Sequence, residues 1–168
     1  MTMTREKQFV FGVDWGKSND YTVISGFDLR TRRQILCDRF NQIDYVVQRG
    51  RLRALYEAWH PTIILAESNS IGAPIIEDLQ RDGLPVVPFH TSNASKVQII
   101  ESLALAFERQ QIELLDNAVQ ISELESYEMT RTATGLPKYS APSGMHDDTV
   151  MALALAHHAA FGYGEAGI

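Results

Sequence analysis

Residues 9–28, which read FVFGVDWGKSNDYTVISGFD, decide the fold. An apolar run over 9–13 ends at Asp14, a short segment rich in Gly, Ser and Asn follows, and a second β-rich run covers 21–27. This pattern predicts a β-hairpin with a carboxylate at the end of its first strand. An Asp in that position can bind a cation or simply cap a turn, so the hairpin by itself leaves the role of Asp14 open.

Hydrophobic periodicity and turn residues predict the elements that follow the hairpin. The expected strands are 33–40, 62–66 and 85–89, and the flanking prolines favour an edge position for the last of them. The expected helices cover 43–59, 72–81, a segment from a cap at Asn93 or Ser95 to about 109, 117–126 and 149–161. The helix that ends at about 109 has an apolar stripe formed by Val97, Ile100, Leu103 and Phe107. The helix over 117–126 has a stripe formed by Val119, Ile121 and Leu124. Residues 130–143 read as a hairpin or an ordered loop.

This order of elements indicates an α/β domain with a mixed sheet of about five strands and helices on both faces. Three antiparallel strands come first and parallel strands follow, with an extra hairpin before the last helix. If the strand that ends before Glu67 lies parallel beside the first strand, Asp14 and Glu67 emerge at the same edge of the sheet. The last helix opens with the acidic pair Asp147 and Asp148, which can supply a further carboxylate there.

Carboxylates that converge in a partly dry site repel one another and need protons or cations. Oxygen ligands without a Cys/His cluster favour Mg²⁺ or Mn²⁺ over zinc. Two such ions about 4 Å apart can support phosphodiester hydrolysis. The alternatives stay open at this point, because Glu67 can be a surface loop residue and Asp147 or Asp148 only a helix cap.

Composition places limits on the class of protein. The 168 residues, 45% hydrophobic and 21% charged, fit one globular domain. We expect a frayed or cloning-derived N-terminus over 1–8, the domain over 9–161 and a flexible tail over 162–168. No membrane span or secretory signal is visible, and the single cysteine, Cys37, cannot form an internal disulfide.

The net charge of −6 argues against indiscriminate binding to nucleic acid. That objection weakens if carboxylates hold divalent metal ions, which add positive charge locally. Basic residues cluster at 30–33, at 49–53 and around Arg131 and Lys138, and most clusters of this kind are solvated faces.

Several pieces of the sequence together resemble the C-terminal nuclease domain of phage terminase large subunits, which belongs to the ribonuclease H-like superfamily. They are 12–16 with Tyr21 and Thr22 after it, 66–72, Lys96, and 144–154, where His-Asp-Asp opens an alanine-rich helix after a hairpin. The resemblance implies a ribonuclease H-like fold and an endonuclease that depends on two divalent ions, Mg²⁺ or Mn²⁺. Its substrate would be concatemeric double-stranded viral DNA, cut during genome packaging.

The resemblance also implies roles for individual residues. Asp14, Glu67 and one or both of Asp147 and Asp148 would be catalytic metal ligands, and both members of the pair can ligate only if the first sits at the helix cap in a non-helical conformation. The supporting residues would be His146 and Lys96. The candidate DNA contacts are Lys17, Arg131, Lys138 and Tyr139.

The partners implied by the family are double-stranded DNA, a packaging ATPase domain, the small terminase and the portal, in the cytoplasm of an infected bacterium and without a membrane. This sequence has no Gly-x-x-x-x-Gly-Lys-Ser/Thr phosphate loop, so we expect no ATP hydrolysis from it. Two rival functions are a Holliday-junction resolvase of the same superfamily and a ribonuclease H-like scaffold that binds partners without cutting.

Overall fold

A computed structural model of the chain describes residues 8–16, 20–41, 44–69 and 71–162. Its centre is a five-stranded sheet in the order β3-β2-β1-β4-β5. The strands are β1 (Phe9–Asp14), β2 (Thr22–Asp28), β3 (Arg33–Phe40), β4 (Ile63–Glu67) and β5 (Val86–Phe89). β1 pairs antiparallel with β2 and parallel with β4, and β5 lies at one edge. The predicted mixed sheet is therefore confirmed, including the edge position of β5.

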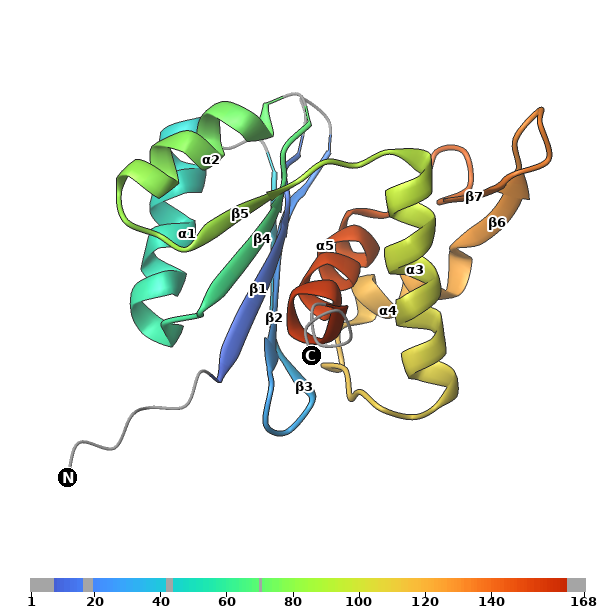
Figure 1. Cartoon of the computed structure of the whole chain (residues 1–168), viewed down its shortest axis with the longest axis horizontal. Coiled ribbons are helices and arrows are strands. Elements are labelled where there is room, and N and C mark those ends of the chain that lie inside the picture. Colours follow the sequence, from blue (N-terminus) through green and yellow to red (C-terminus); the bar gives the residue numbers. More distant parts are fainter. Residues whose placement is uncertain (1–7, 17–19, 42–43, 70, 163–168) are drawn as a thin grey trace, which may run out of the picture.

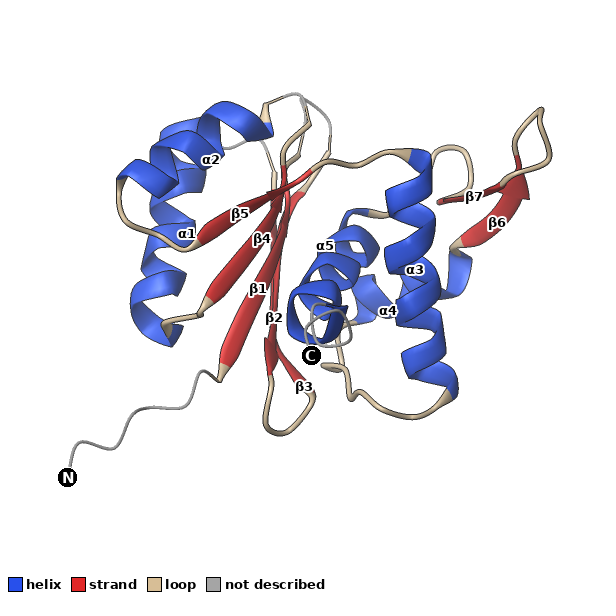
Figure 2. Cartoon of the chain, in the orientation of Figure 1, coloured by secondary structure: helices blue, strands red, loops and turns tan. Residues whose placement is uncertain are grey.

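Helices cover both faces of this sheet (Figures 1 and 2). One face carries α1 (Tyr45–Trp59) and α2 (Gly72–Arg81); the other carries α3 (Asn93–Glu108), α4 (Ala118–Ser126) and α5 (Asp148–His157). A π-helical turn, His158–Gly162, continues α5. The predicted hairpin before the last helix forms from β6 (Glu128–Arg131) and β7 (Pro137–Ser140), and it extends away from the sheet (Figure 1).

Alternation along β1 divides its side chains between two hydrophobic cores. Val10 packs in the core that contains Leu153 of α5, whereas Phe11 and Val13 pack in the core that contains Leu52 of α1. Side chains of a strand point alternately to its two faces, so a strand covered on both sides is apolar throughout. Burial on both faces fixes the register of β1 and hence the position of Asp14 at its end.

Gly12 allows α5 to lie directly against β1. A Cβ atom at this position would be 2.2 Å from the backbone nitrogen of Ala156 and 2.4 Å from the carbonyl oxygen of Ala152. No side chain fits in that space, so the helix backbone touches the strand only because residue 12 is glycine. The contact brings α5 across the middle of the sheet, with its first residues beside the end of β1.

Three local predictions were wrong in detail. Ser92 caps α3, rather than Asn93 or Ser95, and the Ser95 side chain completes a capping box with it. Of the stripe predicted for α3, Phe107 is exposed; the buried positions are Ile99, Ile100, Leu103 and Ala106. The buried face of α3 is thus rotated relative to the predicted stripe, with Ala106 buried in place of Phe107.

The core face of α4 also differs from the prediction. Val119 and Ile121 are exposed, whereas Gln120 and Glu123 are buried. Gln120 exchanges hydrogen bonds with Gln34 of β3 at 2.7 and 2.8 Å. Hydrogen-bonded polar groups can replace an apolar stripe when every buried group finds a partner, and periodicity of hydrophobic residues does not detect this.

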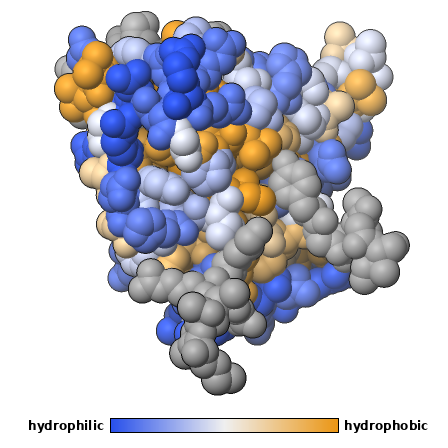
Figure 3. Space-filling view, turned by 60° about the vertical axis from the view of Figure 1, so that its left-hand side comes forward, coloured by the Kyte–Doolittle hydropathy of each residue, from blue (hydrophilic) through white to orange (hydrophobic). Residues whose placement is uncertain are grey.

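The face that carries α1 and α2 is largely hydrophilic, with hydrophobic residues visible between the polar ones (Figure 3). The arginines of the 49–53 cluster are paired there: Arg49 with Asp78 at 3.3 Å, Arg51 with Asp38 at 2.6 Å, and Arg53 with Asp82. These guanidinium groups are already neutralised within the chain. α1 itself begins at Tyr45 after the cap Asp44; residue 43, the predicted start, lies outside the described residues.

Among the helices of the described segments, none has the length and apolar character needed to cross a membrane. The terminal segments predicted to be frayed or flexible lie outside the described residues, apart from Gln8 and Gly162.

Candidate metal centre

Asp14 and Glu67 end two neighbouring parallel strands. Val13 lies opposite Ala66 in the β1–β4 register, so the next residue of each strand is one of the two carboxylates. Asp14 is 9% exposed and shares a hydrogen bond with Glu67. The structure therefore places these two residues side by side at one edge of the sheet, as predicted.

Glu67 is held by a tight loop. A Cβ atom on Gly72, the first residue of α2, would be 2.1 Å from the carbonyl oxygen of Glu67 and 3.0 Å from the Trp15 ring. Because Gly72 has no side chain, the chain turns back directly after β4. This turn keeps the Glu67 backbone close to the first turn of α2.

The acidic pair at the start of α5 completes the carboxylate group. Asp147 is the N-cap, with φ −132° and ψ 17°, and Asp148 is the first helical residue. The non-helical cap conformation is the one that lets both side chains face the same region. Asp148 is 8% exposed, and its Oδ2 accepts a hydrogen bond from the Tyr21 backbone N–H at 3.2 Å.

Lys96 lies in the first turn of α3, and its Nζ atom is 3.2 Å from Oδ2 of Asp147. The same Nζ is 5.8 Å from the centroid of the Tyr127 ring. The lysine thus compensates part of the carboxylate charge and links the site to the segment before β6.

His146 lies between two carboxylates at the outer side of the site. Its Nδ1 is 3.6 Å from Oδ2 of Asp148 and 3.9 Å from Oδ1 of Asp20. One potential ligand atom from each of these three residues lies within 4.8 Å of the others. Asp20 is therefore an additional acidic residue at the site that sequence analysis did not identify.

Burial and mutual repulsion change the acidity of this group. Burial, the hydrogen bond to Glu67 and the charges of Glu67, Asp148 and Asp147 raise the pKa of Asp14 well above its ordinary value. Burial and the charges of Asp20, Asp147 and Glu123 raise the pKa of Asp148 to about 6, against the hydrogen bond from Tyr21. Without a cation, Asp14 and Asp148 keep their protons to a higher pH than an ordinary aspartate does, because their ionised forms are buried beside other negative charges.

This donor set fits divalent cations. The close groups are carboxylates and one imidazole, Lys96 offsets only one negative charge, and Cys37 lies outside the set. Hard oxygen donors in excess of the nearby positive charge suit Mg²⁺ or Mn²⁺. The residues that could hold such ions are Asp14, Glu67, Asp147 and Asp148, with Asp20 and His146 at the rim.

Glu123 supports the start of α5 from α4. Its Oε2 accepts hydrogen bonds from the backbone N–H of Thr149, at 2.9 Å, and from the Thr149 hydroxyl. A carboxylate at the first turn of a helix stabilises free N–H groups and the positive end of the helix dipole. Glu123 therefore helps to fix the orientation of Asp148, the residue immediately before Thr149.

Tyr127, like Asp20 and Glu123, is a residue that sequence analysis missed. Burial and the nearby charges of Asp147 and Asp14 raise its pKa, so the phenol stays protonated at neutral pH. The signal that could have revealed Glu123 is a polar position on the buried side of a helix. No comparable signal exists for Tyr127 or Asp20, because their proximity to the site depends on contacts between distant segments.

The candidate DNA contacts are dispersed. Arg131 and Lys138 are exposed on the β6–β7 hairpin, and Lys17 lies outside the described residues. Tyr139 is held by contacts within the chain. Its ring stacks on Tyr127 with centroids 6.4 Å apart, and its hydroxyl donates a hydrogen bond to Glu101 at 3.3 Å. The structure thus brings the carboxylates, Lys96 and His146 together, and connects the hairpin to them through the Tyr127–Tyr139 stack.

Comparison with known proteins identifies relatives along nearly the whole domain. A family model described as the terminase RNaseH-like domain matches residues 11–160. The large subunit of the terminase of Thermus virus P23-45 is 34% identical over 150 residues, which are 89% of this chain and 31% of that protein. The chain therefore spans about a third of the length of the curated relatives that it matches.

Solved structures agree with this match. The large terminase nuclease of thermophilic phage G20c, determined with bound magnesium, has a TM-score of 0.83 and 33% identity, covering 91% of this chain and 82% of that one. The nuclease domain of the Thermus phage P74-26 large terminase has a TM-score of 0.79 and 33% identity, covering 89% and 78%.

Proposed function

The chain belongs to the terminase RNaseH-like domain family, and from this membership we propose that it is a nuclease domain that hydrolyses phosphodiester bonds of double-stranded DNA with divalent metal ions. The observation that carries the proposal is the meeting of Asp14, Glu67 and the pair Asp147–Asp148 at one edge of the sheet. The G20c nuclease, solved with magnesium, supports the same chemistry here.

In this proposal the four carboxylates would hold two ions, either Mg²⁺ or Mn²⁺. Ions in such a site activate a water molecule and stabilise the leaving oxygen of a phosphodiester. Asp14 shares the inner position with Glu67, and Asp147 and Asp148 approach from α5. Lys96 orients Asp147 and keeps one positive charge beside the site before any ion arrives. His146, at the rim, can hold or pass a proton next to Asp148.

We further propose that the substrate is concatemeric viral DNA and that cutting takes place during genome packaging. The partners would be a packaging ATPase domain, the small terminase and the portal, in the cytoplasm of an infected bacterium. The large-subunit relative, of which this chain matches about a third, supports this placement. ATP hydrolysis would belong to another domain, since this sequence has no phosphate loop.

A cleavage assay tests the proposal. The purified chain, incubated with supercoiled plasmid, should nick or cut it with Mg²⁺ or Mn²⁺ and should be inactive with EDTA. Asp14→Asn and Glu67→Gln should lower the rate below detection, because each removes a ligand charge from the innermost pair. Glu77→Gln, an exposed glutamate of α2, is the matched control and should cut at the wild-type rate.

The same assay separates the rival functions. Preference for a four-way junction over linear duplex would favour a resolvase, and metal binding without cleavage would favour a scaffold. Cutting by Asp14→Asn at the wild-type rate would show that the proposed ligand assignment is wrong.

A further inference from the structure

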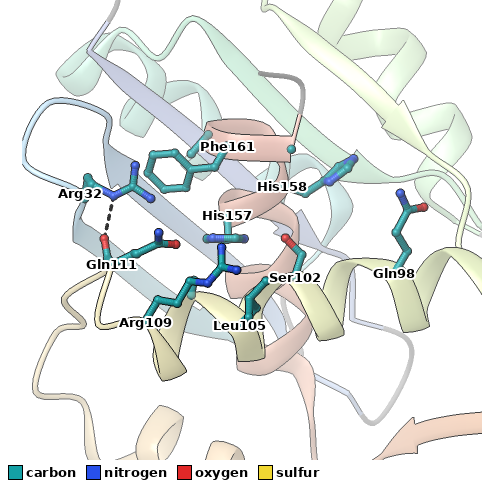
Figure 4. A pocket seen from close by; sticks show the side chains of 12 residues that line it. Arg32, Gln98, Ser102, Leu105, Arg109, Gln111, His157, His158 and Phe161 are labelled. Atoms are coloured by element: carbon teal, nitrogen blue, oxygen red, sulfur yellow. Dashed lines mark hydrogen bonds between the residues drawn. The ribbon is translucent and has the colours of Figure 1, made fainter. Parts of the chain in front are cut away.

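A polar pocket, separate from the carboxylate site, lies at the opposite end of α5. Asp148 begins α5 and His157 ends it, so the two sites are separated by roughly 15 Å along the helix. The pocket has a volume of about 820 Å³ and is lined by residues from the turn before β3, from α3 and from the π-helical end of α5 (Figure 4). Pockets that bind small molecules have volumes of roughly 300–1,000 Å³.

The charged side chains that line this pocket are positive, whereas the net charge of the chain is negative. The described residues that line it include two arginines, Arg32 and Arg109, and among them there is no aspartate or glutamate, although the chain has a net charge of −6. Within the described residues, no carboxylate forms an ion pair with either guanidinium, whereas the arginines of α1 are all paired. Unpaired arginines that share a pocket indicate an anionic ligand.

Arg32 is held in position before any ligand binds. Its backbone has a φ of 59°, its Nε donates to the carbonyl oxygen of Gln111 at 2.7 Å, and its guanidinium carbon lies 3.9 Å from the centroid of the Phe161 ring. These contacts use Nε and one face of the guanidinium. Within the described part of the chain neither terminal nitrogen has a hydrogen-bond acceptor, so the two can act as a pair of donors, which matches the oxygens of a phosphate.

His157 provides an unsatisfied polar atom at the pocket. The residue is 3% exposed and lines the pocket, and its Nδ1 is buried with no hydrogen-bond partner among the described residues. Burial, with the charges of Arg32 and His158, lowers the pKa of His157 to about 4, so the ring is neutral at pH 7 and carries one N–H donor. In Figure 4 the ring lies between Phe161 and the side chains of Arg109 and Ser102.

The backbone that lines the pocket departs from regular α-helical geometry at the end of α5. α5 changes to a π-helical turn at His158–Gly162, and such turns are rare and occur often at functional sites. A Cβ atom on Gly162 would be 2.2 Å from Nδ1 of His158, so a side chain at position 162 would require the His158 ring to move. The turn places Phe161 over Arg32.

Helix dipoles oppose an anion here but do not outweigh the arginines. α3 and α5 both point their C-terminal ends toward the pocket, and each end carries about half a negative charge. The two guanidinium groups carry two positive charges, about twice the combined negative charge of the two helix ends. The remaining balance is positive, and Ser102 and the His157 ring add uncharged hydrogen-bonding groups.

We propose that this pocket binds a phosphate group, with Arg32 and Arg109 as the charged donors and His157 and Ser102 as neutral partners. The phosphate could belong to a free nucleotide or to the backbone of bound DNA. The inference does not depend on the proposed nuclease activity, because none of these residues belongs to the carboxylate site.

Calorimetry in a phosphate-free buffer with EDTA tests the proposal. Inorganic phosphate, deoxyadenosine monophosphate and a short DNA duplex are the three titrants. Saturable binding of at least one of them should weaken at least tenfold in Arg109→Gln, which removes an exposed charged group, and in Ser102→Phe, which fills the pocket. Arg30→Gln, from the same turn as Arg32 but outside the pocket, is the control and should bind as the wild type does.

The titrants distinguish the two sources of phosphate. Binding of the free nucleotide, with equal duplex affinity in wild type and Arg109→Gln, assigns the pocket to a small molecule. A loss of duplex affinity in Arg109→Gln, without nucleotide binding, assigns it to DNA. In either case the ¹⁵N signals of the His157 ring should shift on saturation. If no titrant responds to the two pocket variants and the ring signals stay unchanged, the proposal is wrong.

Discussion

Asp14 is a buried carboxyl group whose nearest ionisable neighbours are also carboxyl groups. Such a residue lowers stability when it is ionised and unaccompanied, because its charge has lost water and gained repulsion. A bound cation would offset this repulsion and the lost hydration of the ionised carboxylate. Ion binding and folding should therefore be linked at this residue.

The first prediction concerns this linkage. Mg²⁺ or Mn²⁺ at about 100 times its dissociation constant should stabilise the chain by about 2.7 kcal/mol. For a chain of this size the melting temperature should rise by roughly 5–10 °C. Asp14→Asn should abolish most of that rise and, in EDTA, melt at the same temperature as the wild type or higher. Calorimetric melting with and without metal measures both effects, and an unchanged metal response in Asp14→Asn would contradict the assignment.

His157 carries the second prediction, on pH. Its pKa is about 4 in the folded chain against an ordinary value of 6.5, so between these values the unfolded chain binds more protons. The contribution of His157 to stability is therefore complete above pH 6.5 and is lost as the pH falls toward 4. Urea unfolding at pH 7 and pH 5 should show a loss about 1–2 kcal/mol larger for the wild type than for His157→Gln. Parallel losses in the two proteins would count against a buried neutral ring.

At the scale of elements, the contact between β1 and α5 joins the fold to the site. α5 crosses β1 at Gly12 and begins at the acidic pair beside Asp14, and Glu123 of α4 holds its first turn. A displacement of α5 moves two of the proposed ligands together. Packing of one helix on one strand thus sets the geometry of the candidate metal centre.

A third prediction compares two glycines. Gly12→Ala should destabilise the chain by about 1–3 kcal/mol or more, since the added methyl group overlaps the α5 backbone. It should also lower cleavage, because α5 carries Asp147 and Asp148. In contrast, Gly50→Ala lies within α1 where an added Cβ meets no atom within 4 Å, and it should stabilise by about 0.5–1 kcal/mol. Urea unfolding of both variants checks the pair; equal effects would mean that α5 tolerates displacement.

At the scale of the whole molecule, charge limits the affinity for DNA. The net charge is −6, several arginines are paired within the chain, and the exposed basic groups near the site are few. Affinity for duplex should therefore be modest and should depend on metal. The β6–β7 hairpin projects beyond the sheet (Figure 1) and carries the exposed residues Arg131 and Lys138, the predicted DNA contacts.

The fourth prediction is a salt dependence. If Arg131 and Lys138 each contact a phosphate, replacing both with Gln should reduce the slope of log affinity against log salt by about 2. Fluorescence anisotropy with a labelled duplex and Ca²⁺ as a non-catalytic ion measures the slope. Arg81→Gln, on the α2 side of the sheet, is the control and should leave it unchanged. An unaltered slope in the double variant would remove the hairpin from the DNA interface.

Local sequence determined most of the secondary structure of this protein. β3 and α2 have the predicted bounds, and the other strands and helices of the sheet layers agree within a few residues, because period, caps and prolines act over short distances. The sheet order and the common edge of Asp14 and Glu67 were also predictable, since right-handed crossover connections leave few alternatives.

Only the tertiary structure decided which residues complete the two sites. Asp20, Glu123 and Tyr127 lie beside the carboxylates, and Arg32 lines one pocket with Arg109 and His157, because the fold brings together segments that are far apart in the chain. Buried polar pairs such as Gln34 with Gln120 likewise have no signature in hydrophobic periodicity. The physical reason is that local pattern sets which backbone forms, whereas burial, charge and hydrogen bonding at a site are set by neighbours that only the folded chain brings together.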